Sequence, residues 1–105
     1  MKIITVLELK QLKDNHADFS LIDVREEYEY ETSQIGGKLI PMGDILEHIH
    51  EIPKDKQVIV HCRSGKRSAT VIHLLETQYG YENLYNLEGG ILAWIQQIDP
   101  SLPSS

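Results

Sequence analysis

Segments rich in apolar residues alternate along the chain with segments in which apolar residues recur at helical spacing. The first kind predicts β-strands at about residues 3–4, 21–24, 38–40, 57–61 and 84–87. The second kind predicts helices at about residues 5–14, 26–32, 45–52, 69–79 and 89–98. Strands that alternate with helices through short connections predict an α/β fold, with a central parallel sheet and helices on both of its faces.

The predicted helices carry recognisable end signals. Thr5 and Glu8 have the spacing of a capping box, Pro53 stops the helix before it, and Gly80 stands where a C-terminal cap is expected. We expect one domain over residues 1–100, followed by a loose tail over residues 101–105.

Composition narrows the classes of function. At 105 residues, with 41% hydrophobic and 25% charged residues, the chain is typical of one soluble globular domain rather than a disordered or membrane protein. A net charge of −6 argues against nucleic acid as a partner. Cys62 is the only cysteine, and the first residues are too short an apolar run for a signal peptide, so the cytoplasm is the expected compartment.

The candidate chemistry lies between the strand at residues 57–61 and the helix at residues 69–79. This connection contains Cys62, and it holds two of the three arginines of an otherwise acidic chain, together with a lysine. A strand-to-helix loop with a flexible glycine can turn successive backbone N–H groups toward one anion. That anion would be the thiolate of Cys62, whose pKa falls from ~8.5 to roughly 3.5–7.5 in such surroundings. The candidate site residues are Cys62, Arg63, Ser64, Gly65, Lys66, Arg67 and Ser68.

An isolated cysteine at a strand end is more often a small buried apolar residue than a nucleophile. Here the neighbouring cations and glycine favour the nucleophile, because an inert thiol has no use for them.

Three groups of residues resemble the rhodanese family of sulfurtransferases. They are the loop at residues 62–68, the segment Asp23-Val24-Arg25-Glu26 with Glu29-Tyr30, and Leu87-Glu88-Gly89-Gly90 with Ala93-Trp94. Similar domains with five residues between the cysteine and the arginine are phosphatases. This chain has four between Cys62 and Arg67, like the sulfurtransferases. It departs from the family at residues 34–37, which read Gln-Ile-Gly-Gly where relatives commonly carry His-Ile-Pro-Gly.

The resemblance implies a two-step sulfur transfer. The Cys62 thiolate would take the sulfane sulfur of a donor such as thiosulfate, and a thiol or cyanide would then remove it from the resulting persulfide. Arg63, Lys66 and Arg67 would attract the anionic donor. The alternative is a persulfide carrier or interaction module in a relay between proteins. A small phosphatase is disfavoured by the short loop.

Two further residues are expected to support the loop. Asp23 and Arg25 follow a neighbouring strand, so they are expected at the same edge of the sheet. We expect Asp23 to orient loop groups by hydrogen bonds. For Arg25, contact with the substrate and an ordinary surface salt bridge are equally open.

Other polar or aromatic positions receive structural interpretations. The acidic run at residues 26–31 is read as a solvated helix face, and Trp94 as part of the core. His61 is read as structural, because adjacent strand residues point to opposite faces. His48 and His50 are two apart on a predicted helix, which is poor geometry for a shared metal, and we expect no metal and no other cofactor.

Overall fold

The fold alternates strands and helices along the whole chain. The computed structural model describes residues 1–104. Its elements are β1 (Lys2–Ile4), α1 (Val6–Asp14), β2 (Phe19–Asp23), α2 (Glu27–Thr32), β3 (Lys38–Leu39), η1 (Met42–Glu51), β4 (Gln57–His61), α3 (Lys66–Tyr79), β5 (Leu84–Leu87) and α4 (Gly90–Gln97). The α/β prediction is confirmed.

The five strands form one sheet in the order β1-β5-β4-β2-β3, and every pair is parallel. Val60 of β4 pairs with Ile22 of β2 on one side and with Asn86 of β5 on the other. Parallel strands all end at the same edge of a sheet. The residues that follow β2, β4 and β5 therefore meet at one edge.

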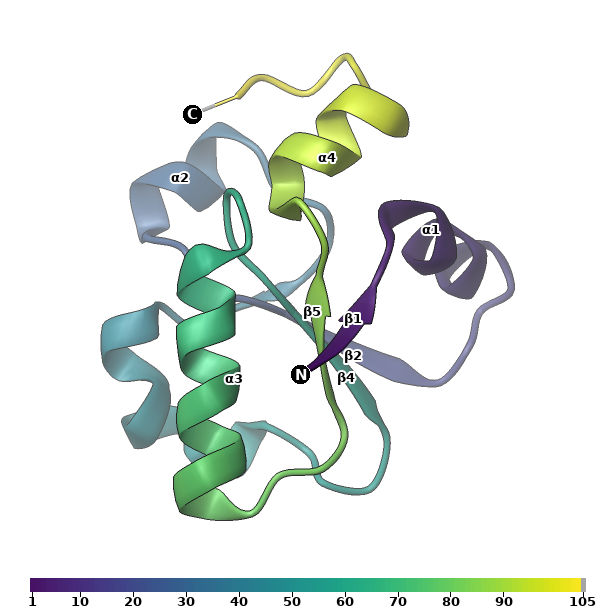
Figure 1. Ribbon diagram of the computed structural model, residues 1–105. Helices are drawn as coiled ribbons and strands as arrows, with labels where there is room; N and C mark the ends of the chain where they lie inside the picture. Colours follow the sequence, from purple (N-terminus) through teal and green to yellow (C-terminus); the bar gives the residue numbers. More distant parts are fainter. Residues whose placement is uncertain (105) are drawn as a thin grey trace.

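Two apolar cores cover the two faces of the sheet. On one face, α3 and η1 pack with residues such as Val71, Ile72 and Ile45 against Val58 and Val60. On the other face, α1 and α4 contribute a second cluster of buried side chains, which includes Leu9, Ile91 and Trp94. Figure 1 shows this layering, with α2 near the carboxyl edge of the sheet. Apolar burial on both faces explains why the central strands read as continuous apolar runs.

The helix ends follow the sequence signals. The Thr5 side chain accepts from the Glu8 N–H at 3.1 Å, and the Glu8 carboxylate accepts from the Thr5 N–H at 3.0 Å. Gly80 ends α3 in the left-handed conformation, with φ +69°. Both predicted caps are therefore confirmed.

The helix expected at residues 45–52 takes a different form. Residues Met42–Glu51 form a 3-10 helix that begins after Pro41 and is interrupted at His48, where φ is −116° and ψ is 17°. Apolar spacing over so short a stretch fits either helix type. Ile45 and Ile52, on either side of the interruption, are both buried.

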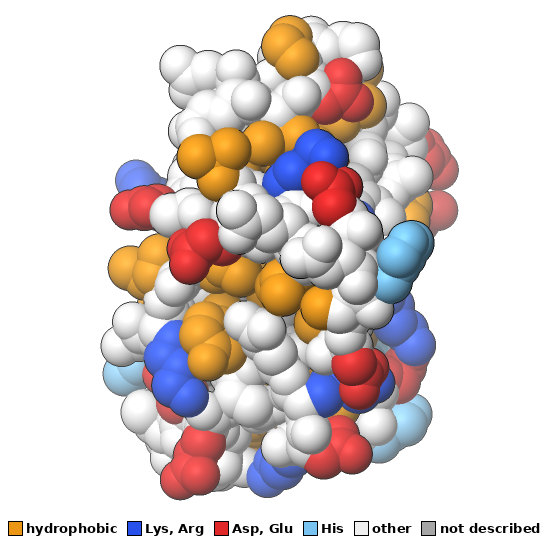
Figure 2. Space-filling model, turned by 90° about the vertical axis from the view of Figure 1, so that its right-hand side faces the viewer, with side chains coloured by type: hydrophobic (Ala, Val, Ile, Leu, Met, Phe, Trp, Pro, Cys, Tyr) orange, Lys and Arg blue, Asp and Glu red, His pale blue; other side chains and the backbone are white. Residues whose placement is uncertain are grey.

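The face that carries α1 mixes apolar and charged side chains (Figure 2). Met1, Ile3 and Leu7 are among the exposed apolar residues of the domain. A shallow hollow lies between the start of α1 and α4, lined by Thr5, Val6, Leu7, Glu88, Gly89, Ala93 and Gln97. No helix within residues 1–104 is both long and apolar enough to cross a membrane.

The proposed boundary at residue 100 stays a prediction. Leu102, inside the expected tail, packs against the core cluster of α1 and α4. Ser105 lies outside the described residues.

Candidate active site

Cys62 stands at the end of β4, and the loop after it folds back over its sulfur. Gly65 has φ +108°, a conformation that side chains rarely allow, and it precedes the first residue of α3. The N–H of Gly65 donates to Cys62 Sγ at 3.1 Å, and the N–H of Ser68 donates to the same sulfur at 3.4 Å. The loop and the start of α3 therefore form an anion cradle around Sγ.

The surroundings of Cys62 act on its acidity in opposite directions. Burial raises the pKa of the thiol, since a charge is costly away from water. Hydrogen bonds from the Ser68 side chain and from the N–H groups of Ser68, Gly65 and Ser64 outweigh that effect, so the pKa of Cys62 lies below its ordinary value. Only 1% of Cys62 is exposed, which favours a ligand that presents a single protruding atom.

The outward side of the loop is held by the start of α4. The N–H of Ile91 donates to the Cys62 carbonyl at 2.9 Å, and that of Leu92 to the Arg63 carbonyl at 3.2 Å. Gly90 lies so close to the loop that a Cβ on it would stand 2.4 Å from the Arg63 carbonyl oxygen. With their carbonyls bound on the outside, the loop residues can turn their N–H groups toward the sulfur.

Arg67 forms a two-pronged ion pair with Glu29 of α2. Its Nη1 lies 2.6 Å from Glu29 Oε1, and its Nη2 lies 2.9 Å from Glu29 Oε2. The hydrogen bond from Arg67 is the main reason that the pKa of Glu29 falls to about 2. Glu29 is 5% exposed, so the reading of residues 26–31 as a solvated face is wrong at this position. The charge of Arg67 is largely balanced before any substrate arrives.

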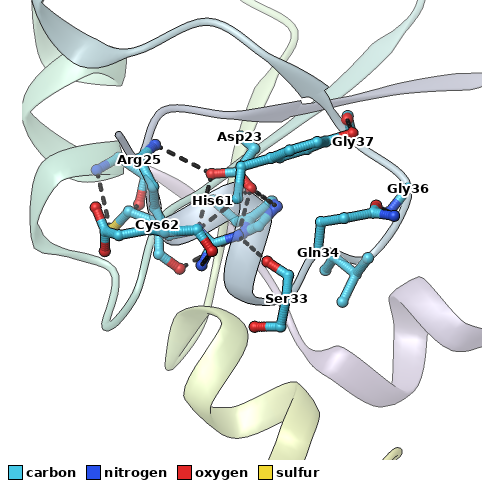
Figure 3. A network of polar contacts seen from close by, with 12 residues as sticks. Asp23, Arg25, Ser33, Gln34, Gly36, Gly37, His61 and Cys62 are labelled. Atoms are coloured by element: carbon cyan, nitrogen blue, oxygen red, sulfur yellow. Dashed lines mark hydrogen bonds and ion pairs between the residues drawn. The ribbon is translucent and has the colours of Figure 1, made fainter. Parts of the chain in front are cut away.

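Arg25 is fully buried. Its guanidinium donates to the Asp23 carboxylate at 2.8–3.2 Å, to the Ser33 carbonyl at 2.7 Å and to the Glu29 carbonyl at 3.4 Å. Figure 3 shows this network beside Cys62. Arg25 thus ties α2 to the end of β2.

This network bears on two expectations. The salt bridge of Arg25 is buried rather than at the surface, whereas contact between Arg25 and a substrate stays a prediction. The Asp23 carboxylate binds Arg25, both at the guanidinium and at the backbone N–H, rather than loop groups. Asp23 therefore fixes the position of Arg25.

His61 is completely buried and pairs in the sheet with Asp23. Its Nε2 lies 3.6 Å from Asp23 Oδ2. Burial is the main cause that lowers the pKa of His61, with the Asp23 charge acting against it, so the ring is neutral near pH 7. This placement agrees with a structural role.

Sequence reasoning missed Asn86 of β5. Its side chain accepts from the Ser68 hydroxyl at 2.6 Å and donates to the Gly65 carbonyl at 3.2 Å. The available signal was an amide side chain within an interior strand of a parallel sheet, where apolar residues are the rule.

The segment at residues 34–37 has a conformation that the common family sequence cannot adopt. Gly36 has φ +91°, whereas proline is restricted to about −65°. Gln34 turns its side-chain oxygen back to the N–H of Gly36, and Lys13 donates to the Ile35 carbonyl at 2.7 Å.

The remaining loop side chains face outward. Arg63, Ser64 and Lys66 are exposed, while Arg67 is partly buried. Arg63 and Lys66 therefore supply positive charge at the surface of the loop, in a chain whose net charge is negative.

Comparisons with known proteins agree with this geometry. The Rhodanese-like domain family model matches residues 5–97. A Bacillus subtilis protein named "Putative sulfurtransferase YtwF" is 38% identical, covering 95% of this chain and 96% of its own. Another from B. subtilis, named "Putative sulfur carrier protein YrkF", is 29% identical, covering 87% of this chain and 49% of its own.

A crystal structure of a rhodanese-like domain protein from Staphylococcus aureus has a TM-score of 0.83 and 33% identity, covering 100% of this chain and 99% of its own. The chain spans about a quarter, 26%, of a longer Mycobacterium tuberculosis relative named "Probable adenylyltransferase/sulfurtransferase MoeZ". Relatives with these names support a role in sulfur transfer. With the fold, the loop and the family model in agreement, the chain belongs to the rhodanese-like domain family.

Proposed function

We propose that the protein is a sulfurtransferase in which Cys62 carries the transferred sulfur as a persulfide. The observation that carries this proposal is the cradle itself, in which Sγ accepts hydrogen bonds from the N–H groups of Gly65 and Ser68. Such a cradle favours the thiolate, which is the nucleophilic form of cysteine. The same N–H groups favour negative charge on a sulfur attached to Sγ.

The first step is a displacement at the sulfane sulfur of thiosulfate. The Cys62 thiolate forms an S–S bond to that sulfur, the bond to the sulfonate breaks, and sulfite leaves with the electron pair. In the second step cyanide or a thiolate attacks the outer sulfur, and Cys62 is released as a thiolate. Charge balances in both steps. Each step is a displacement at sulfur, so neither requires an external oxidant.

Two side chains are proposed to recruit the anionic donor. Arg63 and Lys66 are exposed on the loop, whereas Arg67 is half-buried. Exposed cations beside a buried nucleophile raise the local concentration of an anion. We assign recruitment to Arg63 and Lys66, and a positioning role to Arg67.

A second function in the same class is transfer between proteins. Two relatives favour a persulfide module that works with protein partners: the one named as a sulfur carrier, and the longer sulfurtransferase of which this chain matches a quarter. We propose the cytoplasm as the compartment of the protein. Steady-state kinetics with thiosulfate and cyanide, compared with transfer from a protein persulfide, distinguish the two. An enzyme turns over the small molecules, whereas a carrier needs the protein donor. Efficient hydrolysis of an aryl phosphate would contradict both.

A further inference from the structure

The Ser68 hydroxyl lies between two groups that can accept its single proton. Its Oγ is 2.6 Å from Asn86 Oδ1 and 3.4 Å from Cys62 Sγ. A serine hydroxyl has one O–H donor and lone pairs that accept. It can therefore donate to Asn86 or to the sulfur, but not fully to both.

Gly65 decides the orientation of the Asn86 amide. The Gly65 carbonyl oxygen, 3.2 Å from Asn86 Nδ2, can only accept a hydrogen bond, so the NH₂ end of the amide must face it. The other end, Oδ1, then faces Ser68 and can only accept. The Ser68 proton is thus directed to Asn86, and the lone pairs of Ser68 Oγ face Sγ.

We propose that Asn86 is a positioning residue that holds the Ser68 hydroxyl proton away from Sγ while the sulfur is uncharged and releases it toward Sγ when the sulfur becomes a thiolate. In the thiol form, S–H donates to Ser68 Oγ, and Ser68 donates to Asn86. In the thiolate form, the hydroxyl turns about its Cβ–Oγ bond and donates to Sγ. No covalent bond changes in this rotation.

The rotation of the Ser68 hydroxyl would also serve catalysis, an inference that rests on the proposed function. In the persulfide, Sγ carries neither proton nor full charge, so the hydroxyl returns to Asn86. When an acceptor removes the outer sulfur, Sγ leaves as an anion, and the Ser68 hydroxyl is within reach to stabilise it. Asn86 thus accepts the hydroxyl proton of Ser68 in the thiol and persulfide states, in which Sγ carries no full negative charge.

This arrangement predicts the direction in which the pKa of Cys62 changes when Asn86 is removed. A purely structural role of Asn86 predicts the opposite direction. Because Asn86 competes with the thiolate for one proton, removing Asn86 should lower the pKa of Cys62. A residue that only kept the loop in shape would have the opposite effect, because its loss would let the N–H groups of Gly65 and Ser68 move away from Sγ.

Several charged or titratable groups lie around the cysteine loop. Glu29 of α2 has a pKa of about 2, and the pKa of Arg67 of α3 is raised further above its ordinary value by that carboxylate. On the β2 and β4 side stand the Asp23–Arg25 ion pair and His61, whose pKa is lowered by burial. The loop itself carries the exposed cations Arg63 and Lys66.

The test is the pH dependence of Cys62 alkylation by iodoacetamide in protein without bound sulfur. We expect Asn86→Ala to move the midpoint down by about 0.5–1 pH unit, the size of one neutral hydrogen bond such as that between Ser68 and Asn86. In a Ser68→Ala background the same change should produce no downward shift. An unchanged or higher midpoint in Asn86→Ala, or an equal fall without the hydroxyl, would overturn the proposal.

Asn83→Ala is the matched control. Asn83 also donates through Nδ2 to two carbonyls, those of Pro53 and Lys56, but it precedes the opposite end of β5. It should leave the midpoint unchanged. If Asn86→Ala does not fold, the nearly isosteric Asn86→Leu carries the same expectation.

Ser68→Ala alone adds a measurement that does not depend on substituting Asn86. We expect it to raise the alkylation midpoint by less than about 0.5 pH unit. Competition from Asn86 already reduces the stabilisation that the Ser68 hydroxyl provides to the thiolate, so little is lost with the hydroxyl. A rise of about one unit or more would contradict the competition. These measurements use no sulfur donor, so a protein that shows the shifts but takes up no sulfur would refute the proposed function and leave the switch standing.

Discussion

Glu29 and Arg67 are 38 positions apart in the sequence and form a two-pronged ion pair at 2.6 and 2.9 Å that fastens α2 to the start of α3. Glu29 is almost completely buried, whereas the Arg67 side chain is 31% exposed. The carboxylate also accepts from the Glu26 N–H at 3.0 Å and so caps its own helix. The pair therefore sets where the last part of the cysteine loop stands relative to α2.

Glu29→Gln is expected to destabilise the domain by about 1–3 kcal/mol, because it leaves the Arg67 guanidinium with a neutral partner in a partly buried place. Glu31→Gln is the matched control, since Glu31 lies on the same helix and is exposed. Urea unfolding of both variants at neutral pH measures the effect. Equal stability of the two variants would mean that the ion pair contributes nothing.

The same pair predicts a pH dependence of stability. The pKa of Glu29 is about 2 in the folded protein, below its ordinary value of 4.5. A carboxyl whose folded pKa is depressed contributes stability above its unfolded pKa and loses it as the pH falls through the folded value.

The difference in unfolding free energy between the natural protein and Glu29→Gln should therefore be constant above about pH 5 and shrink between pH 4.5 and 2. Urea unfolding of both proteins across this range is the measurement. A difference that stays constant down to pH 2 would mean that the Glu29 carboxylate is not the source of the stability.

Gly90→Ala is expected to disturb the cradle from outside. The added Cβ would lie 2.4 Å from the Arg63 carbonyl oxygen and 2.6 Å from that of Cys62, and Gly90 has φ +60°. We expect a loss of roughly 1–3 kcal/mol in stability and a rise in the alkylation midpoint of Cys62 toward that of a free thiol. Gly43→Ala, where a Cβ would meet nothing within 4 Å, should change neither property.

Donor recruitment should depend on Arg63 and Lys66 more than on the net charge of the chain. Replacing both by alanine is expected to raise KM for thiosulfate several-fold at low salt, with a smaller effect at high salt because exposed charges are screened. Lys10→Ala is the control, since Lys10 pairs with Asp14 on α1. If Lys10→Ala raised KM as much as the double variant does, the loop cations would have no special role in recruiting the donor.

Much of the fold could be predicted because local patterns determine it. The buried strand Gln57–His61 and the Thr5–Glu8 capping box both rest on neighbouring residues. The 3-10 form of η1 could not be predicted, because burial of Ile45 and Ile52 depends on the finished core.

The site was predictable only in its loop. Residues 62–68 are contiguous, so their chemistry is visible in the sequence. The partners of the loop come from other elements: Glu29 from α2, Asn86 from β5 and the N–H groups of α4. For Arg25, the sequence left substrate contact and a surface salt bridge equally open. Its full burial depends on Asp23 and on the carbonyls of Glu29 and Ser33, which only the fold brings together.

The central claim is that the Cys62 cradle holds a transferable sulfur. The most direct measurement is the intact mass of the purified protein after incubation with thiosulfate, with Cys62→Ser as the control. A serine hydroxyl has a similar volume but does not form an accessible anion here. We predict that the natural protein gains the mass of one sulfur atom, loses it when cyanide is added, and that Cys62→Ser gains none. Absence of the gain in the natural protein with both thiosulfate and a protein persulfide as donor, or the same gain in Cys62→Ser, would contradict this account.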